Sequence, residues 1–276
     1  MIRQFRQVDV FTTVPYRGNP VAVVLGGDGL STEEMQRFAN WTNLSETTFV
    51  VQPTAAEADY QLRIFTPSRE LSFAGHPTLG SCHAWLEAGH RPRRPGLVVQ
   101  QCGVGLVPIR RLEAGLAFAA PPVLRGEPVD EALAVRLAAM LGIARGDIAA
   151  ARWADNGPGW IGVMLESAEA VLALRPPAIS VDVGVFGPYP PGSPEAFEVR
   201  AFFRSNGVTV EDPVCGSFNA SLARWLLSAG LVRAPYVVSQ GTVLGRRGRV
   251  HVGQDADGEI WIGGGAVTSV TGVAEL

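Results

Sequence analysis

Two segments of equal length that are apolar or small on nearly every side constrain this chain most. They span residues 75–89 and 216–230, and we expect helices within them over 77–88 and 217–229. A helix without a polar face has to be buried on all sides. Because short alternating segments fill much of the remaining chain, the sequence predicts two sheets, each wrapped around its own central helix.

The two segments also look like copies of each other at a constant offset of 141 residues. Each ends in Leu-x-Ala-Gly, follows a strand that ends in phenylalanine, and precedes a Val-Val-x-Gln strand. The matched residues are Leu86, Ala88 and Gly89 with Leu227, Ala229 and Gly230; Phe65 with Phe202 and Phe203; and Val98, Val99 and Gln101 with Val237, Val238 and Gln240. Three matched elements in the same order indicate an internal duplication.

Two further helices are expected outside these segments. The helix over 31–42 begins with a capping box of Ser31 and Glu34, and the helix over 130–141 is amphipathic. Strands with alternating apolar residues, separated by Gly and Pro, are predicted at 21–25, 47–51, 60–64, 97–101, 160–165, 197–203, 237–240 and 260–262.

The predicted fold is α+β, with two similar halves that are each a mostly antiparallel sheet around a central helix. We expect an N-terminal half over 1–117, completed by a C-terminal strand over 264–276, and a second half over 118–263. The proline-containing stretch 115–130 is expected to be the linker. In such a duplicated fold, a cleft between the halves is the natural place for a ligand.

Composition excludes several kinds of function. The 276 residues include no lysine, so a Schiff-base lysine, a pyridoxal-phosphate anchor and a phosphate-loop lysine are impossible. The net charge of -3 gives no reason to expect nucleic-acid binding. An odd number of cysteines without Cys-x-x-Cys spacing fits a reducing cytoplasm, and no apolar run approaches the length of a membrane span.

Both central helices begin with unusual residues. The first starts at Gly75-His76-Pro77, with proline at the preferred first helical position, and the second follows Asp212 and starts at Gly216-Ser217. Glycine allows close approach of the backbone, and the free N–H groups of a helix start bind anions. The sequence therefore predicts that these helix starts hold a carboxylate or an enolate without any lysine.

Several ordered blocks carry a resemblance to a known family. They are Val8-Asp9-Val10-Phe11, Gly18-Asn19-Pro20, Val23-Val24-Leu25, Asn43-Leu44-Ser45-Glu46-Thr47, Arg63-Ile64-Phe65-Thr66-Pro67, Gly75-His76-Pro77-Thr78-Leu79, Asp155-Asn156-Gly157-Pro158-Gly159 and Glu211-Asp212-Pro213-Val214-Cys215-Gly216-Ser217. Together they resemble the phenazine-biosynthesis isomerase (PhzF-like) family. The blocks are spread over most of the chain, and they are specific for the family but not for one substrate.

The resemblance implies a diaminopimelate-epimerase-like fold and a homodimer that works without a cofactor on a small carboxylate substrate. It also implies isomerisation of the trans-2,3-dihydro-3-hydroxyanthranilate type, in which one glutamate removes a proton from one carbon and returns it to another. That glutamate corresponds to Glu46. The residues that correspond to the family's other catalytic and substrate-binding residues are His76, Asp212, Gly75, Gly216 and Ser217.

Apart from the resemblance, a single group that acts as both base and acid is chemically reasonable. A group that takes and returns a proton has to work in both protonation states. From the residues alone, alternatives stay open. Glu46 could be a surface residue at a helix exit, His76 and Ser217 could be helix caps, and Asp212 could be a turn residue before proline.

Three rival functions also remain. A two-thiol epimerase or racemase places a cysteine before the glycine of each helix start, and here Cys215 has only Ala74 as its counterpart. Cys215 is therefore either a small buried residue, a thiolate at a helix start, or the partner of Glu46 in a mixed pair. The chain could also be an inactive small-molecule binding protein. Metal binding is disfavoured, because His76 and His83 match no established ligand spacing.

Overall fold

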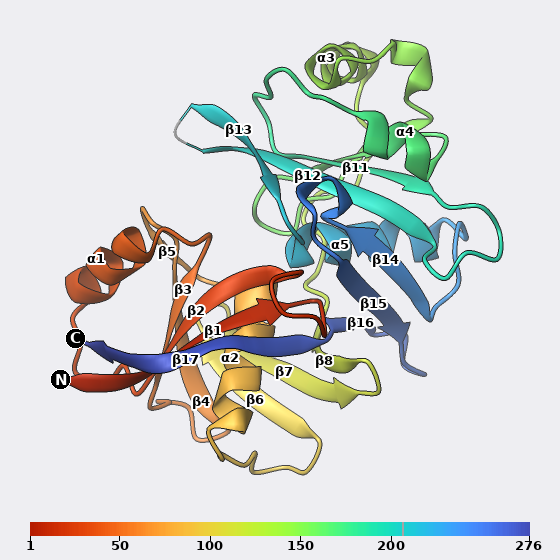
Figure 1. The fold of residues 1–276 in the computed structure, drawn as a ribbon. Helices are drawn as coiled ribbons and strands as arrows, with labels where there is room; N and C mark the ends of the chain where they lie inside the picture. Colours follow the sequence, from red (N-terminus) through yellow and green to blue (C-terminus); the bar gives the residue numbers. More distant parts are fainter. Residues whose placement is uncertain (206) are drawn as a thin grey trace. The chain divides into compact units, whose positions relative to one another are not determined.

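The structure is a computed structural model that describes residues 1–205 and 207–276. It divides into two compact units, one formed by Met1–Ala119 with Gly263–Leu276 and the other by Ala120–Ile262. The two chain ends both belong to the first unit. There the N–H of Leu276 donates to the carbonyl of Met1 at 2.9 Å, and β17 runs beside β1 (Figure 1).

In the first unit the sheet order is β17-β1-β2-β3-β4-β6-β7-β8, with β5 added beside β4. The strands are β1 (Ile2–Val10), β2 (Asn19–Leu25), β3 (Thr47–Val51), β4 (Tyr60–Phe65), β5 (Glu70–Leu71), β6 (Leu97–Cys102), β7 (Gly105–Leu112), β8 (Gly115–Ala119) and β17 (Ala266–Glu275). Helix α2 (Gly75–Glu87) packs against β1, β2, β3, β4, β8 and β17. The sheet therefore wraps around it (Figure 1).

Helix α1 (Thr32–Thr42) packs on β3 and β4 through a small cluster that includes Met35, Ala39, Phe49 and Phe65. Helix α2 approaches β2 so closely that a Cβ on Gly80 would lie 2.4 Å from Cγ1 of Val21. Only glycine fits at this contact, which fixes how deeply α2 is buried.

In the second unit the sheet order is β9-β10-β11-β12-β14-β15, with β13 added beside β12. The strands are β9 (Ala150–Trp153), β10 (Ile161–Met164), β11 (Val183–Pro188), β12 (Phe197–Ser205), β13 (Val208–Asp212), β14 (Tyr236–Gln240) and β15 (Gly248–Gln254), and β16 (Ile260–Gly264) follows them. The helices are α3 (Glu131–Leu141), α4 (Ala168–Ala173) and α5 (Gly216–Ser228), with single 3-10 turns at Arg145–Asp147 and Thr242–Leu244.

Helices α3 and α4 share one apolar core with strands of this sheet, in which Leu137, Val171 and Phe202 are buried together. Helix α5 packs closely on strands β10 and β11. A Cβ on Gly184 would lie 2.2 Å from the ring of Phe218, so glycine makes room for the aromatic ring of the helix.

The two units repeat one pattern of strand pairing. Along β1-β2-β3-β4-β6-β7 the pairs are antiparallel, parallel, antiparallel, parallel and antiparallel, and the same series runs along β9-β10-β11-β12-β14-β15. Each central helix has 13 residues. The fold is thus the duplicated α+β fold that the sequence predicts, with a mostly antiparallel sheet around each central helix.

All four predicted helices are confirmed within two residues at each end, including the capping box of Ser31 and Glu34. Two expectations need correction. Helix α4 was not predicted, because six residues are too few to show helical periodicity. The expected linker 115–130 begins with a strand, β8, whose alternating small and apolar residues are not those of a loop.

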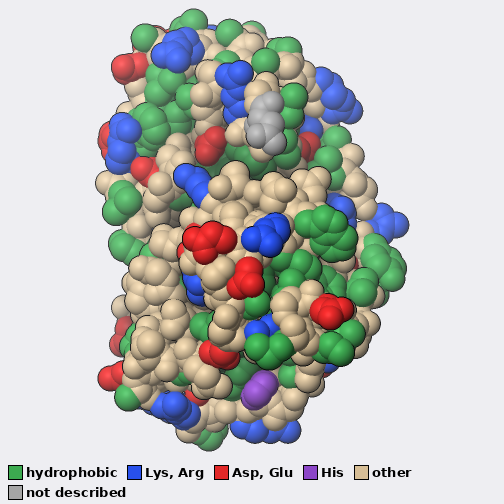
Figure 2. Space-filling model, turned by 90° about the vertical axis from the view of Figure 1, so that its left-hand side faces the viewer, with side chains coloured by type: hydrophobic (Ala, Val, Ile, Leu, Met, Phe, Trp, Pro, Cys, Tyr) green, Lys and Arg blue, Asp and Glu red, His purple; other side chains and the backbone are tan. Residues whose placement is uncertain are grey.

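Among the described residues, no helix has both the length and the apolar character that crossing a membrane requires. On the face shown in Figure 2, arginines and acidic side chains lie interspersed among apolar ones. This mixture agrees with the small net charge of -3.

Candidate active site

The starts of the two central helices differ from those of the other three α-helices. Ser31, Asp130 and Ser167 cap α1, α3 and α4 by accepting a hydrogen bond from a first-turn N–H group. The N-cap residues of α2 and α5, Ala74 and Cys215, form no such side-chain hydrogen bond. First-turn N–H groups have no partner within the helix and carry partial positive charge. The two central helices therefore keep donors that suit an anionic group of a ligand.

His76 and Glu46 form a close pair in the first unit. Nε2 of His76 lies 3.2 Å from Oε2 of Glu46, and the two side chains are 7% and 15% exposed. This is within ion-pair distance, although the alignment of the contact falls short of a hydrogen bond. A largely buried carboxylate thus lies beside a buried imidazole.

Burial lowers the pKa of His76 to about 3, and a hydrogen bond to the backbone of Pro20 opposes this only in part. The cost of placing a charged imidazolium in this core is the larger of the two effects. His76 is therefore neutral near pH 7, with one N–H donor and one acceptor nitrogen. In this state it can donate a hydrogen bond, but it adds no positive charge to the site.

The backbone holds Glu46 in place immediately before β3. Helix α1 ends at Asn43, which adopts a left-handed conformation with φ of 55° and turns the chain toward the sheet. The carbonyl of Glu46 accepts a hydrogen bond from the N–H of Ala22 at 3.3 Å, which extends the parallel pairing of β2 and β3. A hydroxyl contact of 2.7 Å between Thr42 and Thr47 spans the turn. Glu46 thus has a fixed backbone.

At the start of α5, a second set of polar residues surrounds Ser217. Nε1 of Trp160 donates to the Ser217 hydroxyl at 3.0 Å, and Nδ2 of Asn156 donates to the Ser217 carbonyl at 2.9 Å. Both donors come from the segment between β9 and β10, about 60 residues earlier in the chain. They fix the orientation of Ser217 in the first turn.

Cys215 is buried, and burial raises the pKa of its thiol well above the usual value. The charge of Asp212 adds to this effect, while the Ser217 hydroxyl, 3.5 Å from the sulfur, opposes it. The thiol is therefore protonated near pH 7. A reactive cysteine has the opposite character, with a lowered pKa and partial exposure.

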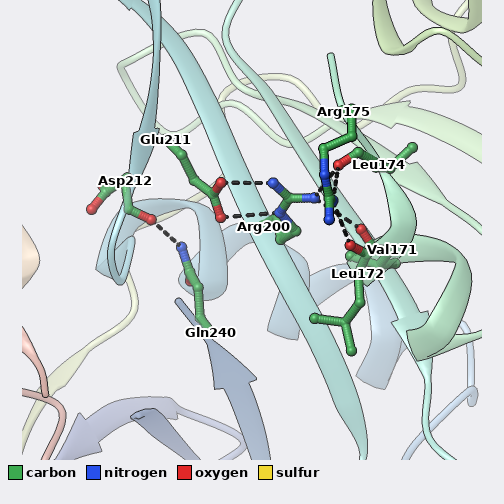
Figure 3. Close-up of polar contacts among 8 residues, drawn as sticks. All are labelled: Val171, Leu172, Leu174, Arg175, Arg200, Glu211, Asp212 and Gln240. Carbon is green, nitrogen blue, oxygen red and sulfur yellow. Dashed lines mark hydrogen bonds and ion pairs between the residues drawn. The ribbon is translucent and has the colours of Figure 1, made fainter. Parts of the chain in front are cut away.

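Gln240 connects the residues on both sides of the α5 start. Its Oε1 accepts from the N–H of Cys215 at 3.1 Å and from Nδ2 of Asn219 at 2.8 Å. Its Nε2 donates to the carbonyl of Asp212 at 3.2 Å (Figure 3). Gln240 is fully buried, so this network holds the turn between β13 and α5 in one conformation.

A buried ion pair anchors β13 just before Asp212. Nε and Nη2 of Arg200 donate to the two carboxylate oxygens of Glu211 at 3.0 and 2.7 Å. Nη1 donates to the carbonyls of Leu174 and Val171 at the end of α4 (Figure 3). Arg200 therefore ties the end of β13 to β12 and α4, and Asp212 is the next residue along the chain.

The structure brings Glu46 and His76 together, with Gly75 beside His76 at the start of α2. It also brings Asp212, Cys215, Gly216 and Ser217 together at the start of α5. The described residues contain no group of three or more His, Cys, Asp or Glu side chains that could hold a metal ion. His83 instead contacts the Thr268 hydroxyl through Nε2 at 3.2 Å.

Sequence reasoning did not single out two polar residues of these clusters, Asn19 and Trp160. Asn19 contacts His76 from a position 57 residues earlier, and Trp160 contacts Ser217 from 57 residues earlier. Asn19 stands in one of the blocks that carry the family resemblance, which is the signal that could have identified it. For Trp160 the sequence carries only a strand pattern.

Comparison with known proteins identifies the family of this chain. The family model of phenazine biosynthesis-like proteins, PhzC-PhzF, matches residues 8–272. The chain is 36% identical to Antisense-enhancing sequence 1 of Schizosaccharomyces pombe, over 97% of each chain. It is 34% identical to trans-2,3-dihydro-3-hydroxyanthranilate isomerase of Pseudomonas aeruginosa, over 91% of this chain and 90% of that protein.

Solved structures show the same fold. A PhzF-family phenazine biosynthesis protein of Bacillus anthracis superposes over the full length of both chains with a TM-score of 0.85, at 23% identity. A predicted epimerase of Pseudomonas aeruginosa and a hydroxyproline epimerase of Agrobacterium vitis are among the further structural neighbours, with TM-scores of 0.81 and 0.59. The duplicated, diaminopimelate-epimerase-like architecture is therefore shared beyond this one family.

Proposed function

This chain belongs to the PhzC-PhzF family of phenazine biosynthesis-like proteins, and on that premise we propose that it is an isomerase that moves a proton within a small conjugated carboxylate. The proposed reaction is of the trans-2,3-dihydro-3-hydroxyanthranilate type, which the name of the Pseudomonas aeruginosa relative supports. The observation that carries the proposal is the close pair of Glu46 and neutral His76.

In this mechanism the Glu46 carboxylate removes a proton from one carbon of the substrate. The C–H bonding electrons move into the conjugated system, and the Glu46 carboxylic acid then returns the proton to a different carbon. No electrons leave the substrate, so the step needs no oxidant, reductant or cofactor. A neutral His76 suits this role, because it adds no positive charge that would hold the nearby carboxylate permanently ionised.

The remaining residues are proposed to bind the substrate. The first-turn N–H groups at Gly75 and Gly216 suit a carboxylate or a developing enolate. Ser217 is fixed by Trp160 and Asn156 and can bind through its hydroxyl or its N–H group. Asp212 is proposed to bind a substrate amine or hydroxyl. The family resemblance further suggests that the protein acts as a homodimer.

The alternative of a thiol epimerase has less support. It needs a thiolate that accepts a proton, whereas burial and Asp212 hold the pKa of the Cys215 thiol well above its usual value. The partner position in the first unit is Ala74, which cannot act as a base. An inactive binding protein would keep the same residues, so only turnover separates it from the isomerase.

The experiment is proton NMR in deuterated buffer with dihydrohydroxyanthranilate, comparing wild type with Glu46→Gln. Gln is nearly isosteric but cannot carry the proton. We expect isomerisation or deuterium uptake with wild type only, while the Glu46→Gln protein remains folded by circular dichroism.

Cys215→Ser serves as the matched control, because it removes the only thiol at the α5 start. Loss of exchange in Cys215→Ser with retention in Glu46→Gln would favour the epimerase. Binding of the substrate without any turnover by wild type would favour an inactive binding protein.

A further inference from the structure

We infer that the second unit carries a further small-molecule site, a groove that binds an organic anion with an apolar ring. The groove runs along α5 from Ser221 onward and has a volume of about 810 Å³, which is within the usual range for small-molecule sites. Its lining includes three arginines and two tryptophans: Arg152, Arg224, Arg233, Trp153 and Trp225. The site does not depend on the proposed reaction, because its described lining contains no residue of the candidate active site.

The charged side chains of this lining all have the same sign. No aspartate or glutamate is among the described lining residues. One acidic side chain lies nearby, since Oε1 of Glu259 is 3.4 Å from Nη2 of Arg224. Arg152 and Arg233 form no ion pair with any described residue. The groove therefore keeps a surplus of positive charge, which attracts an anion.

Arg152 is held in a way that leaves its terminal amino groups for a ligand. Its backbone on β9 pairs with Gly162 of β10, and its Nε donates to the carbonyl of Gly126 at 2.9 Å. Its guanidinium carbon lies 5.6 Å from the centroid of the Trp225 ring. A guanidinium binds a carboxylate or phosphate through two parallel N–H groups. An oxyanion bound to Arg152 would therefore lie close to the Trp225 ring.

Trp225 places apolar surface beside this charge. It is 9% exposed, and its ring packs edge-on against Phe186 with the centroids 5.1 Å apart, so its position is fixed. Aliphatic side chains of Val123, Val232 and Ile260 also line the groove. Burying a ring against such surface adds to the affinity that an exposed ion pair alone would give. The lining therefore favours an anion that carries a ring over a bare ion.

Ser221 contributes a polar group on the buried side of the groove. It is 2% exposed, and its hydroxyl has no hydrogen-bond partner among the described residues. Buried hydroxyls of native proteins nearly always bind a protein group, a water molecule or a ligand. Ser221 thus offers an unused donor and acceptor to a ligand, directly or through a water molecule.

The first unit shows how the same face of its own central helix is covered. At the offset of 141 residues, His83 of α2 corresponds to Arg224 of α5, and the residue one turn later is Glu87 in α2 and Ser228 in α5. The Thr268 hydroxyl of β17 contacts His83 at 3.2 Å and Glu87 at 2.6 Å. Arg224 and Ser228 instead line the groove. A strand thus covers this helix face in one unit, whereas the other unit leaves it available to a ligand.

The first test is NMR of protein labelled with ¹⁵N in tryptophan and titrated with phenyl phosphate. Trp153→Phe, Trp160→Phe and Trp225→Phe assign the three indole signals. We expect the Trp153 and Trp225 signals to shift and to saturate. Trp160 is the internal control, because its indole donates to Ser217 at the start of α5, eight residues or about 12 Å before Trp225. A shift of the Trp160 signal alone would place the ligand at the helix start and overturn the inference.

The second test removes the charges one at a time. Arg152→Gln should weaken phenyl phosphate binding on the order of 10-fold. Arg233→Gln should weaken it roughly 3-fold, and because Arg233 is exposed and unpaired among the described residues, this variant should fold like wild type. Arg136→Gln is the matched control, since it removes the same charge from an exposed position on α3 outside the lining. Equal weakening by Arg136→Gln and the two groove variants would show an effect of net charge alone and overturn the site.

Further probes define the ligand class. Benzoate replaces phenyl phosphate to distinguish a carboxylate ligand from a phosphate ligand. Phenol, which lacks the charge, and inorganic phosphate, which lacks the ring, should each bind on the order of 10-fold more weakly than phenyl phosphate. Equal binding of either would overturn the proposed class. Sedimentation tests a different occupant: a dimer that Arg233→Glu dissociates, without any phenyl phosphate shift in wild type, would show that a second copy covers the groove and would overturn the inference.

Discussion

The starts of α2 and α5 have the same architecture but different chemistry. Both helices have 13 residues, begin at a glycine and lack a side-chain cap. The residue after the glycine is His76 in one and Ser217 in the other. The first is part of a pair suited to proton transfer, whereas the second is held by hydrogen bonds from Trp160 and Asn156. Duplication has thus kept the uncapped helix start, and we propose that it has separated the roles of the two starts.

The frame behind each helix start is also duplicated. Gln100 on β6 donates to the Thr78 hydroxyl at 3.0 Å, and Gln240 on β14 accepts from the Asn219 amide at 2.8 Å. Thr78 and Asn219 are each the fourth residue of their helix, and both glutamines are fully buried. A buried amide therefore ties the strand after each helix to its first turn, while the residues around it have diverged.

The largest expected difference between the two starts is in rate. Glu46→Gln should lower kcat/KM on the order of 10³-fold, because the proton carrier is lost, whereas Cys215→Ser should stay within about 10-fold of wild type. Steady-state assays of both variants with the same substrate measure this. Equal losses in the two would show that both helix starts take part in proton transfer, and the separation of roles would be wrong.

A second contrast concerns a duplicated ion pair. Arg63 binds both carboxylate oxygens of Glu70 between β4 and β5, at 2.8 and 2.7 Å, as Arg200 binds Glu211 between β12 and β13. The Arg200 and Glu211 side chains are 4% and 9% exposed, against 22% and 37% for Arg63 and Glu70.

Arg200→Met should therefore lower the free energy of unfolding by about 3–5 kcal/mol, because it leaves the Glu211 charge buried without its partner. Arg63→Met should cost at most about 1 kcal/mol, since water solvates Glu70. Urea unfolding of both variants checks this. Similar losses would mean that burial does not distinguish the two pairs.

Much of the arrangement of helices and strands could be predicted from the sequence, because it depends on the periodicity of apolar residues and on helix caps. The exceptions have physical causes. The strands that were not predicted are β1, β5, β7, β8, β9, β11, β13 and β15. In β1, the pairing with β17 shifts register between Gln7 and Val8, which interrupts the alternation of apolar residues. The sequence match paired Gln101 with Gln240, but the buried counterpart is Gln100, and Gln101 binds Thr54 on the exposed side.

The candidate site was predictable only in part. Residue types and the family resemblance pointed to Glu46 and His76, but no pattern in one sequence shows that a buried Asn19 faces the imidazole. That contact depends on how β2 packs on α2. Likewise, the high pKa of the Cys215 thiol is set by burial and by Asp212, and both are tertiary properties.

The next prediction concerns how the free energy of unfolding depends on pH through His76 at the start of α2. The pKa of His76 is about 3 in the folded state and about 6.5 when unfolded. Between these two pKa values, His76 binds a proton in the unfolded chain but not in the folded protein. The free energy of unfolding is therefore at its full value above pH 6.5, and it decreases as the pH falls toward 3. The contribution of His76 to this decrease is about 1.4 kcal/mol per pH unit.

Urea unfolding of wild type and His76→Gln at pH 6.5 and 5 measures it, and the variant should lose less stability on acidification. The controls are His83 and His251, whose pKa values are also lowered by burial and which are present in both proteins. A stability that rises on acidification in wild type only would indicate a charged His76 paired with Glu46.

The smallest expected effect tests whether the uncapped start of α2 serves binding. Ala74→Ser adds a neutral cap that can accept only from the N–H of His76, because the third residue of α2 is Pro77. An N-cap serine is worth up to about 1 kcal/mol, so the variant should unfold at higher urea concentration. The same hydroxyl competes with an anionic ligand for a first-turn N–H group, so KM should rise roughly two- to five-fold. Ser31→Ala is the converse control on α1, and it should lower stability by about 1 kcal/mol with KM unchanged. If Ala74→Ser stabilises the protein and leaves KM as it was, the substrate does not use the N–H groups of α2, and the absent cap at Ala74 has no role in binding.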